Sequence, residues 1–471
     1  MFGKAAGTLK RKRHNKNGLD SGIEGEGIPA LRRKVAGIDL GSTSHWVCGP
    51  TVDGLRREVE EFGATTPELE KLAAWLKERN VESVAMESTG VYWIAPYELL
   101  ERHGLDVLLV STRAFAQAPG RRKTDRIDCQ WIQRLHSCGL LNGSFRPAEQ
   151  VTMLRTLVRD KANLEAEQAD WLRRMQKSLD QMNVRVHRAV SDMQGTTGMA
   201  IIRAIVAGER NPAELAKLRN PGCRKSEEEI AEQLSGHWRP DHLFSLAQSL
   251  QMYDAIAERI DAYDKEILRR LGELERAECG DTQAPKLKNG NKAKMIRQRG
   301  EEDMRQAFYR MSGVDLTAVD GVGVGVVEVV LSEYGADLSR FPTEKHFVSH
   351  ATLAPNKPFS GGKPLKKKKR GSASSRLSAA LRSAALTLRH SQTALGAYFR
   401  HTALRLGADV AAFATARKLA TLIYRLLRWG HEYVDDGAEA YERRYQAARI
   451  SRLAATAANL GYKILPRAIN P

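Results

Sequence analysis

Cysteine is scarce in this chain, with five residues among 471, all widely separated and none in a CxxC pair. This scarcity argues against a disulfide framework and a zinc ribbon, and it fits a reducing cytosol. Long apolar runs are also missing, because no stretch approaches the ~20 residues that a membrane-spanning helix needs. The first residues are charged and glycine-rich and lack the apolar segment of a signal peptide. We therefore expect a cytoplasmic protein with no membrane partner.

Positive charge is abundant. Lys and Arg total 74 against 56 Asp and Glu, which gives a formal net charge of +18. A field of this sign favours a polyanionic partner, most often a nucleic acid, and an acidic membrane surface is the competing interpretation. The chain is long enough for two or three domains, each with its own core.

The N-terminal part divides into an arm and a domain. Residues 1–33 have no apolar periodicity, and we expect a disordered basic arm there. Residues 34–145 alternate between strand and helix patterns. The order is three strands in a meander, then helix, strand, helix, strand and helix, which predicts an α/β domain of the RNase H-like (RuvC-like) fold. The expected elements are strands Val35–Leu40, His45–Val52 and Leu55–Phe62, a helix from Thr66, strand Val81–Met86, helix Val91–Arg102, strand Leu105–Val110 and helix Lys123–Cys138.

Four acids in this domain predict a metal site. Asp39 and Glu87 end two strands that are neighbours in the RNase H-like fold, and Asp125 and Asp128 share one face of a helix. Carboxylates that converge repel one another unless a divalent cation lies between them, and two Mg²⁺ ions support phosphodiester cleavage. The alternatives are a strand-end acid that caps a turn and helix acids that face solvent. The basic residues before the helix are placed to meet a phosphate backbone: Arg121, Arg122 and Lys123.

Residues 146–278 show two helical seams of coiled-coil type, which pair either within the chain or in a dimer. Residues 279–306 lack periodicity and are expected to form a flexible linker. We therefore place a domain boundary in this segment.

The C-terminal part comprises a domain at 307–450 and a basic tail at 451–471. Gly321 and Gly323 lie in a glycine-rich turn that leads into an apolar helix, which resembles a helix-hairpin-helix element whose backbone N–H groups meet phosphates. Ser360 is expected in a flexible loop, where a serine before glycines is most often a turn residue. A dense basic patch for polyanion binding follows it: Lys363, Lys366, Lys367, Lys368, Lys369 and Arg370.

These segments together resemble a known family. In the N-terminal half they are GIDLG, MESTGVYW and KTDRID, and the insert TTGMAIIRAIVAGERNPAELAKL follows them. In the C-terminal half they are DGVGVGVVEVVLSEYG, LSRFPTEKHFVSHATLAP, and SGGK with its basic run. The chain resembles the bacterial insertion-sequence transposases that combine a DEDD, RuvC-like domain with a C-terminal catalytic serine, the bridge-RNA-guided recombinases.

The resemblance implies specific roles. It makes the four acids, Asp39, Glu87, Asp125 and Asp128, a tetrad that binds Mg²⁺ or Mn²⁺. It makes Ser360 the nucleophile that forms a phosphoserine link with DNA. It also implies a composite site in a dimer or larger homo-oligomer and a noncoding guide RNA that selects DNA by base pairing. The lysine-dense run after Ser360 departs from the family pattern and leaves other serines as alternatives: Ser372, Ser374 and Ser375.

Together with this resemblance, the sequence predicts a metal-dependent DNA transposase or recombinase, and the resemblance implies that it acts through a seryl-DNA intermediate. One alternative is an RNase H-like nuclease or resolvase that uses water, in which Ser360 is only a loop residue. The other is a non-catalytic nucleic-acid-binding protein.

Overall fold

The computed structural model describes residues 30–52, 56–88, 90–111, 124–274, 283–355, 359–361, 363–364, 375–430 and 437–465. The chain divides into two compact units, Met1–Arg146 and Pro147–Pro471. Among the described helices, none is both long and apolar enough to cross a membrane.

The first unit is built on one five-stranded sheet with the strand order β3-β2-β1-β4-β5. The first three strands form an antiparallel meander, whereas β4 runs parallel to β1 and β5 runs parallel to β4. The strands are β1 (Val35–Leu40), β2 (Ser44–Val52), β3 (Arg56–Gly63), β4 (Ser83–Glu87) and β5 (Asp106–Val110). This mixed sheet with helices is consistent with the predicted RNase H-like fold.

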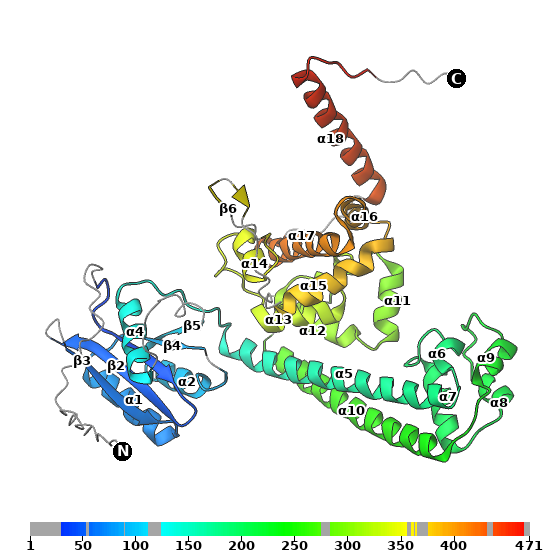
Figure 1. The fold of residues 1–471 in the computed structure, drawn as a ribbon, viewed down its shortest axis with the longest axis horizontal. Helices are drawn as coiled ribbons and strands as arrows, with labels where there is room; N and C mark the ends of the chain where they lie inside the picture. The colour runs from blue at the N-terminus through cyan, green and yellow to red at the C-terminus, as the bar shows by residue number, and fades with distance from the viewer. Residues whose placement is uncertain are drawn as a thin grey trace, which may run out of the picture. The chain divides into compact units, whose positions relative to one another are not determined.

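Helices cover both faces of this sheet. On one face, Ile38 packs in a buried apolar cluster with residues of α1 (Thr66–Glu78) and α2 (Ile94–Arg102). The apolar stripe predicted for α1 is buried as expected: Leu69, Leu72, Ala73 and Leu76. On the other face lies α4 (Asp125–Ser137), which packs across β1 (Figure 1).

Gly37 permits α4 to lie directly on the sheet. A Cβ atom at this position would lie 2.3 Å from the backbone N of Gln133 and 2.6 Å from the carbonyl O of Cys129. Backbone atoms cannot move aside as a flexible side chain can, so any larger residue at position 37 pushes the helix away from β1.

Gly37→Ala is therefore expected to destabilise the first unit by about 1–3 kcal/mol, the usual cost of overpacking. Thermal unfolding and amide exchange of α4 measure the effect. Gly272→Ala is the matched control, because a Cβ there meets nothing within 4 Å and alanine favours a helix interior. Unchanged unfolding and exchange in Gly37→Ala would contradict this close packing.

The second unit begins with a helical hairpin. The helices α5 (Glu149–Gln181) and α10 (Pro240–Glu273) lie side by side (Figure 1). The apolar seams predicted that these helices pair either within the chain or in a dimer, and in the structure they pair within the chain. Supercoiling of the pair stays a prediction. Four short helices connect them: α6 (Val186–Ala189), α7 (Thr196–Ala207), α8 (Pro212–Ala216) and α9 (Glu227–Leu234). Their core, which includes Ile202, also contains Met175 of α5 and Leu246 of α10.

The rest of the second unit is mostly helical. Its elements are α11 (Gly290–Gln298), α12 (Glu302–Ser312), η1 (Leu316–Ala318), α13 (Val324–Tyr334), α14 (Glu344–His350), β6 (Phe359–Ser360), β7 (Lys363–Pro364), α15 (Arg376–Thr387), η2 (Leu388–His390), α16 (Ala394–Leu406), α17 (Ala408–Trp429) and α18 (Gly437–Asn459).

Three sequence predictions differ from these elements. The expected linker at 279–306 contains α11 and the start of α12. The expected boundary between residues 450 and 451 falls inside α18. The loop expected around Ser360 is instead a two-stranded hairpin, in which Ser360 pairs with Lys363. Each difference is a local element that apolar periodicity did not reveal.

Candidate active site

Asp39 and Glu87 lie at the carboxyl ends of two neighbouring parallel strands. The register pairs Gly37 with Ala85 and Ile38 with Met86, so Asp39 and Glu87 follow at the same level. Neighbouring strands are about 4.8 Å apart. The two acids therefore lie next to each other at one edge of the sheet.

Both acids project to the face that α4 covers. Side chains alternate along a strand, so Asp39 shares the face of Gly37, whose Cβ position points at α4. Residues paired in register share a face as well, which places Glu87 on that side with Asp39.

The last turn of α4 lies at the start of the parallel strands, because His136 bonds to Ser83, the first residue of β4. The helix therefore runs opposite to β1, and its N-terminus lies at the edge with the acids. Gln133 lies over Gly37, and Asp128 precedes it by a rise of about 7.5 Å along the helix. Asp39 lies further along β1 than Gly37 by a similar distance, about 6.6 Å. Asp128 is 8% exposed, whereas Asp125 is exposed in the same first turn.

The electrostatics of Cys129 agree with this arrangement. The pKa of its thiol is raised first by its hydrogen bond with Cys48 and by burial, and the negative charge of Asp39 raises it further. Cys129 directly follows Asp128 in α4, so the Asp39 carboxylate lies close to the first turns of this helix.

Local capping fixes where α4 begins. Thr124 is the N-cap residue, and its hydroxyl accepts a hydrogen bond from the backbone N–H of Ile127 at 3.3 Å. Two acids in the first turn also suit the positive end of the helix dipole. The same cap thus stabilises the helix and sets the position of Asp128. The predicted phosphate contacts Arg121, Arg122 and Lys123 lie outside the described residues.

The donor chemistry at this edge suits a hard cation, because carboxylate oxygens are the ligands that Mg²⁺ prefers. The structure brings Asp39, Glu87 and the N-terminus of α4 to one place. However, within the described ranges no group of three or more His, Cys, Asp or Glu residues is close enough to hold a metal ion. The metal tetrad therefore stays a prediction.

Two residues beside Glu87 were missed by the sequence reasoning. Val91 is 69% exposed and Tyr92 is 45% exposed, directly after the strand that ends in this acid. Of these two, the exposed ring of Tyr92 offers the kind of aromatic surface on which nucleic-acid bases stack. The available signal was the run VYW immediately after MESTG.

His136 anchors the other end of α4 and was also missed. Its Nε2 lies 2.9 Å from Oγ of Ser83, and that hydroxyl donates to Oδ2 of Asp106 at 3.0 Å. Because the hydroxyl proton is used in this way, the neutral imidazole donates through Nε2. Burial, followed by the charge of Arg32, lowers the pKa of His136 to about 4, and Asp106 opposes this shift.

This histidine predicts an acid-sensitive first unit. Its folded pKa lies below the ordinary value of 6.5, so the unfolded chain binds the proton first as the pH falls. The stability is complete above pH 6.5 and decreases by about 3 kcal/mol as the pH falls from 6.5 to about 4. Denaturant unfolding over this range should show a smaller decrease in His136→Gln. The surface variant His103→Gln should keep the wild-type decrease, and equal slopes in all three proteins would contradict the prediction.

The candidate nucleophile lies in the second unit. Ser360 ends β6, and Gly361 follows with a φ of +57°, a left-handed conformation that favours glycine. The backbone of Lys363 lies opposite in β7. The other predicted phosphate contacts in this patch lie outside the described residues: Lys366, Lys367, Lys368, Lys369 and Arg370.

Of the three alternative serines, the structure describes one. Ser372 and Ser374 lie outside the described residues. Ser375 is the N-cap of α15: its Oγ accepts a hydrogen bond from the backbone N–H of Ser378 at 3.0 Å and donates to the carbonyl of Ala351 at 2.9 Å. Its hydroxyl is therefore already used in folding.

The glycine-rich turn before α13 has a packing explanation. Gly321 has a φ of +81°, and a Cβ there would lie 3.0 Å from Leu388 and 3.1 Å from the carbonyl of Ala384. Gly323 is the N-cap of α13. The turn thus requires Gly321 for conformation and close packing, and its predicted phosphate contact stays a prediction.

Comparison with known proteins gives two matches. The IS110 model of DEDD type, described as a transposase, matches residues 36–184. The model described as transposase IS116/IS110/IS902 family matches residues 313–400. The first range contains the four predicted acids and the second contains Ser360. A search of curated proteins found no match.

Proposed function

Because this chain belongs to the IS110 family of insertion-sequence transposases, we propose that it cuts and rejoins DNA through a covalent link to Ser360. The observation that carries the site is the convergence of Asp39, Glu87 and the acidic first turn of α4 at one edge of the sheet. The acidic edge lies in the range that one family model matches, and the serine hairpin lies in the range that the other matches.

In the proposed reaction, Oγ of Ser360 attacks a DNA phosphorus atom. A new P–O bond to serine forms, the phosphodiester P–O bond to the leaving strand breaks, and that strand leaves with a hydroxyl end. The serine proton passes to a base, and the leaving oxygen gains a proton. A serine hydroxyl stays protonated near neutral pH and is then a weak nucleophile, so it requires a base or a metal ion to activate it. The phosphoserine link keeps the bond energy for the rejoining step.

The four acids, Asp39, Glu87, Asp125 and Asp128, are the proposed holders of Mg²⁺ or Mn²⁺. When bound, such an ion stabilises the attacking and leaving oxygens of a phosphoryl transfer. In this proposal, Asp39 and Glu87 would bind the ion from two strand ends, and Asp128 would bind it from a helix that Thr124 caps. This arrangement supports metal binding because each acid is positioned by its element rather than by a mobile loop.

The proposal includes two partners that the resemblance implies, a noncoding guide RNA and a second copy of the chain. The net charge of +18 suits a polyanion. Base pairing with a guide would supply the sequence recognition, and the protein would then contact mainly the nucleic-acid backbone.

Trapping of a protein–DNA adduct tests the proposed function. The purified protein is incubated with a divalent cation, with RNA transcribed from the noncoding DNA beside its gene, and with labelled DNA carrying the ends of its element. The mixture is then denatured, and the adducted peptide is identified by mass spectrometry. An adduct on the peptide that contains Ser360 is expected, with chelation of divalent ions and ribonuclease treatment each reducing it. Cleavage without an adduct would favour hydrolysis by water, and neither cleavage nor adduct would favour a non-catalytic binding protein.

A further inference from the structure

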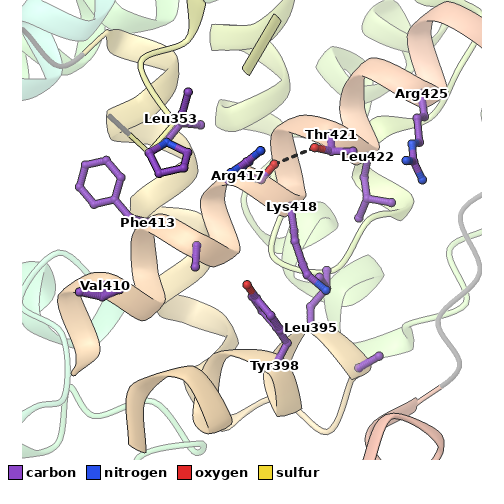
Figure 2. A pocket seen from close by; sticks show the side chains of 14 residues that line it. Leu353, Leu395, Tyr398, Val410, Phe413, Arg417, Lys418, Thr421, Leu422 and Arg425 are labelled. Carbon is purple, nitrogen blue, oxygen red and sulfur yellow. Dashed lines mark hydrogen bonds between the residues drawn. The ribbon is translucent and has the colours of Figure 1, made fainter. Parts of the chain in front are cut away.

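A cavity of about 680 Å³ opens beside α17 in the second unit. Its walls come from three places in the sequence: the segment after α14, the start of α16, and one face of α17. Figure 2 shows Leu353, Tyr398 and Phe413 around it, with Lys418 and Arg417 from α17 between them. A space of this size is typical of small-ligand sites.

The cavity is cationic. Of the described residues that line it, three are basic and none is acidic. Arg425 is neutralised by Glu344, which accepts two hydrogen bonds from it at 2.7 and 3.1 Å. Arg417 lies close enough to Glu344 for its charge to help lower the pKa of that carboxyl. Lys418 makes no ion pair within the described part of the chain, so an anionic occupant would supply its missing partner.

Lys418 combines a charge with an aromatic surface. Its Nζ lies 3.9 Å from the centroid of the Tyr398 ring. The residue as a whole is exposed, yet partial burial of the ammonium and the charge of Arg444 lower its pKa. A cation held over a ring, without a carboxylate partner, is suited to a phosphate that arrives together with an apolar group.

Phe413 supplies a flat apolar surface at the mouth of the cavity. It is 41% exposed, and the guanidinium of Arg382 lies 4.9 Å from its ring centroid. Val410, one helical turn earlier, is 47% exposed. An exposed aromatic ring beside cationic side chains is the combination that binds bases and phosphates of single strands.

The cavity lies close in the sequence to the serine hairpin. Pro355 lines the cavity and precedes Ser360 by five residues, a distance of about 17 Å at most in a fully extended chain. The length of the connecting chain alone therefore keeps Ser360 near this wall of the cavity.

We propose that this cavity receives one unstacked nucleotide of the DNA strand that Ser360 attacks, with its base against Phe413 and its phosphate beside Lys418. The proposal rests on the proposed function for the identity of the strand. A base that remains stacked in a duplex cannot enter, so the cavity selects a single-stranded or locally melted segment.

Binding of short labelled DNA to the full-length protein tests the cavity. Phe413→Ala is expected to weaken binding of single-stranded DNA about tenfold, with less than about a twofold change for duplex. For single-stranded DNA, the logarithm of the binding constant falls linearly with the logarithm of the salt concentration. Lys418→Met is expected to make this slope less steep by about 0.7. Phe244→Ala is the matched control, because this phenylalanine on α10 is 67% exposed and lies outside the cavity.

An abasic series locates the nucleotide. Each DNA in the series lacks the base at one position. For the wild-type protein, one such position should weaken binding, and for Phe413→Ala the loss of the base at that position should not change binding further. Equal losses for single strand and duplex, or losses confined to RNA of the same sequence, would overturn the proposal. If these substitutions instead abolish binding of an acidic peptide and leave DNA binding unchanged, the cavity is assigned to a protein partner and the proposal is overturned.

The adduct assay separates this proposal from the proposed function. A Ser360 adduct together with normal binding by the cavity variants overturns the cavity proposal alone. Selective loss of single-strand binding in a protein that forms no adduct supports the cavity and overturns the proposed function.

Discussion

Ser360→Ala is expected to abolish the covalent protein–DNA adduct and to reduce strand cleavage by about 10³-fold or more, because the nucleophile is removed. The structure places Ser360 beside the turn of a two-stranded hairpin, with Gly361 in a left-handed conformation. Ser360→Ala leaves the main chain free to keep this conformation. DNA binding, measured by fluorescence anisotropy, should therefore remain close to that of the wild type.

The matched control is Ser375→Ala, which removes a hydroxyl fifteen residues further on. That hydroxyl caps α15 and bonds to the carbonyl of Ala351. Its loss should cost about 1 kcal/mol of stability while the adduct still forms. If Ser375→Ala loses the adduct and Ser360→Ala keeps it, the nucleophile has been assigned to the wrong serine. Cleavage that persists in Ser360→Ala without any adduct would favour water as the nucleophile.

The sequence predicted the site-bearing elements of the first unit because their signals are local. Strands with buried apolar residues, an acid at each strand end, and a helix cap before the DxxD pattern all lie within a few residues of one another. The strands end where the sequence indicated to within one or two residues. The neighbouring placement of Asp39 and Glu87 then follows from element order and parallel pairing.

The approach of α4 to β1 was not predictable from periodicity. In the sequence, Gly37 is simply one small residue within an apolar strand. Only the position of α4 against this strand shows why a side chain is excluded there. His136 is a similar case, because its partners Ser83 and Asp106 come from two strands. Such contacts depend on tertiary packing, which a pattern along one segment does not encode.

The helix α11 was missed for a physical reason. It is polar and has one buried residue, Ile296, so it carries no apolar stripe. Tertiary contacts support it instead: Lys292 is half-buried and donates to the carbonyl of Thr317 and, at 2.9 Å, to that of Val319. For α5 and α10 the apolar seams were visible in the sequence, but they did not identify the partner. Such a seam suits a helix in the same chain or in another copy equally well.

Asp39→Asn is expected to reduce strand cleavage and adduct formation by about 10³-fold, because it removes a charged metal ligand while keeping the side-chain shape. Asp39 lies level with Glu87 on the face under α4, and one fewer negative charge weakens the attraction for a divalent cation. Asp106→Asn is the control, because this exposed carboxylate begins β5 at the opposite edge of the sheet and its amide can still accept the hydrogen bond from Ser83.

Thermal unfolding separates loss of the metal from loss of the fold. An ion that binds only the folded protein raises its stability, by about 2.7 kcal/mol at a concentration one hundredfold above Kd. The wild type and Asp106→Asn should therefore unfold at higher temperature in Mg²⁺ or Mn²⁺ than with a chelator. Asp39→Asn should lose most of this increase, yet unfold near the wild-type temperature when the chelator is present, since removal of a charge beside Glu87 relieves repulsion. A variant that keeps both cleavage and the metal-dependent increase would show that Asp39 is not a ligand, and the role of the strand-end acids would return to capping the turn after β1.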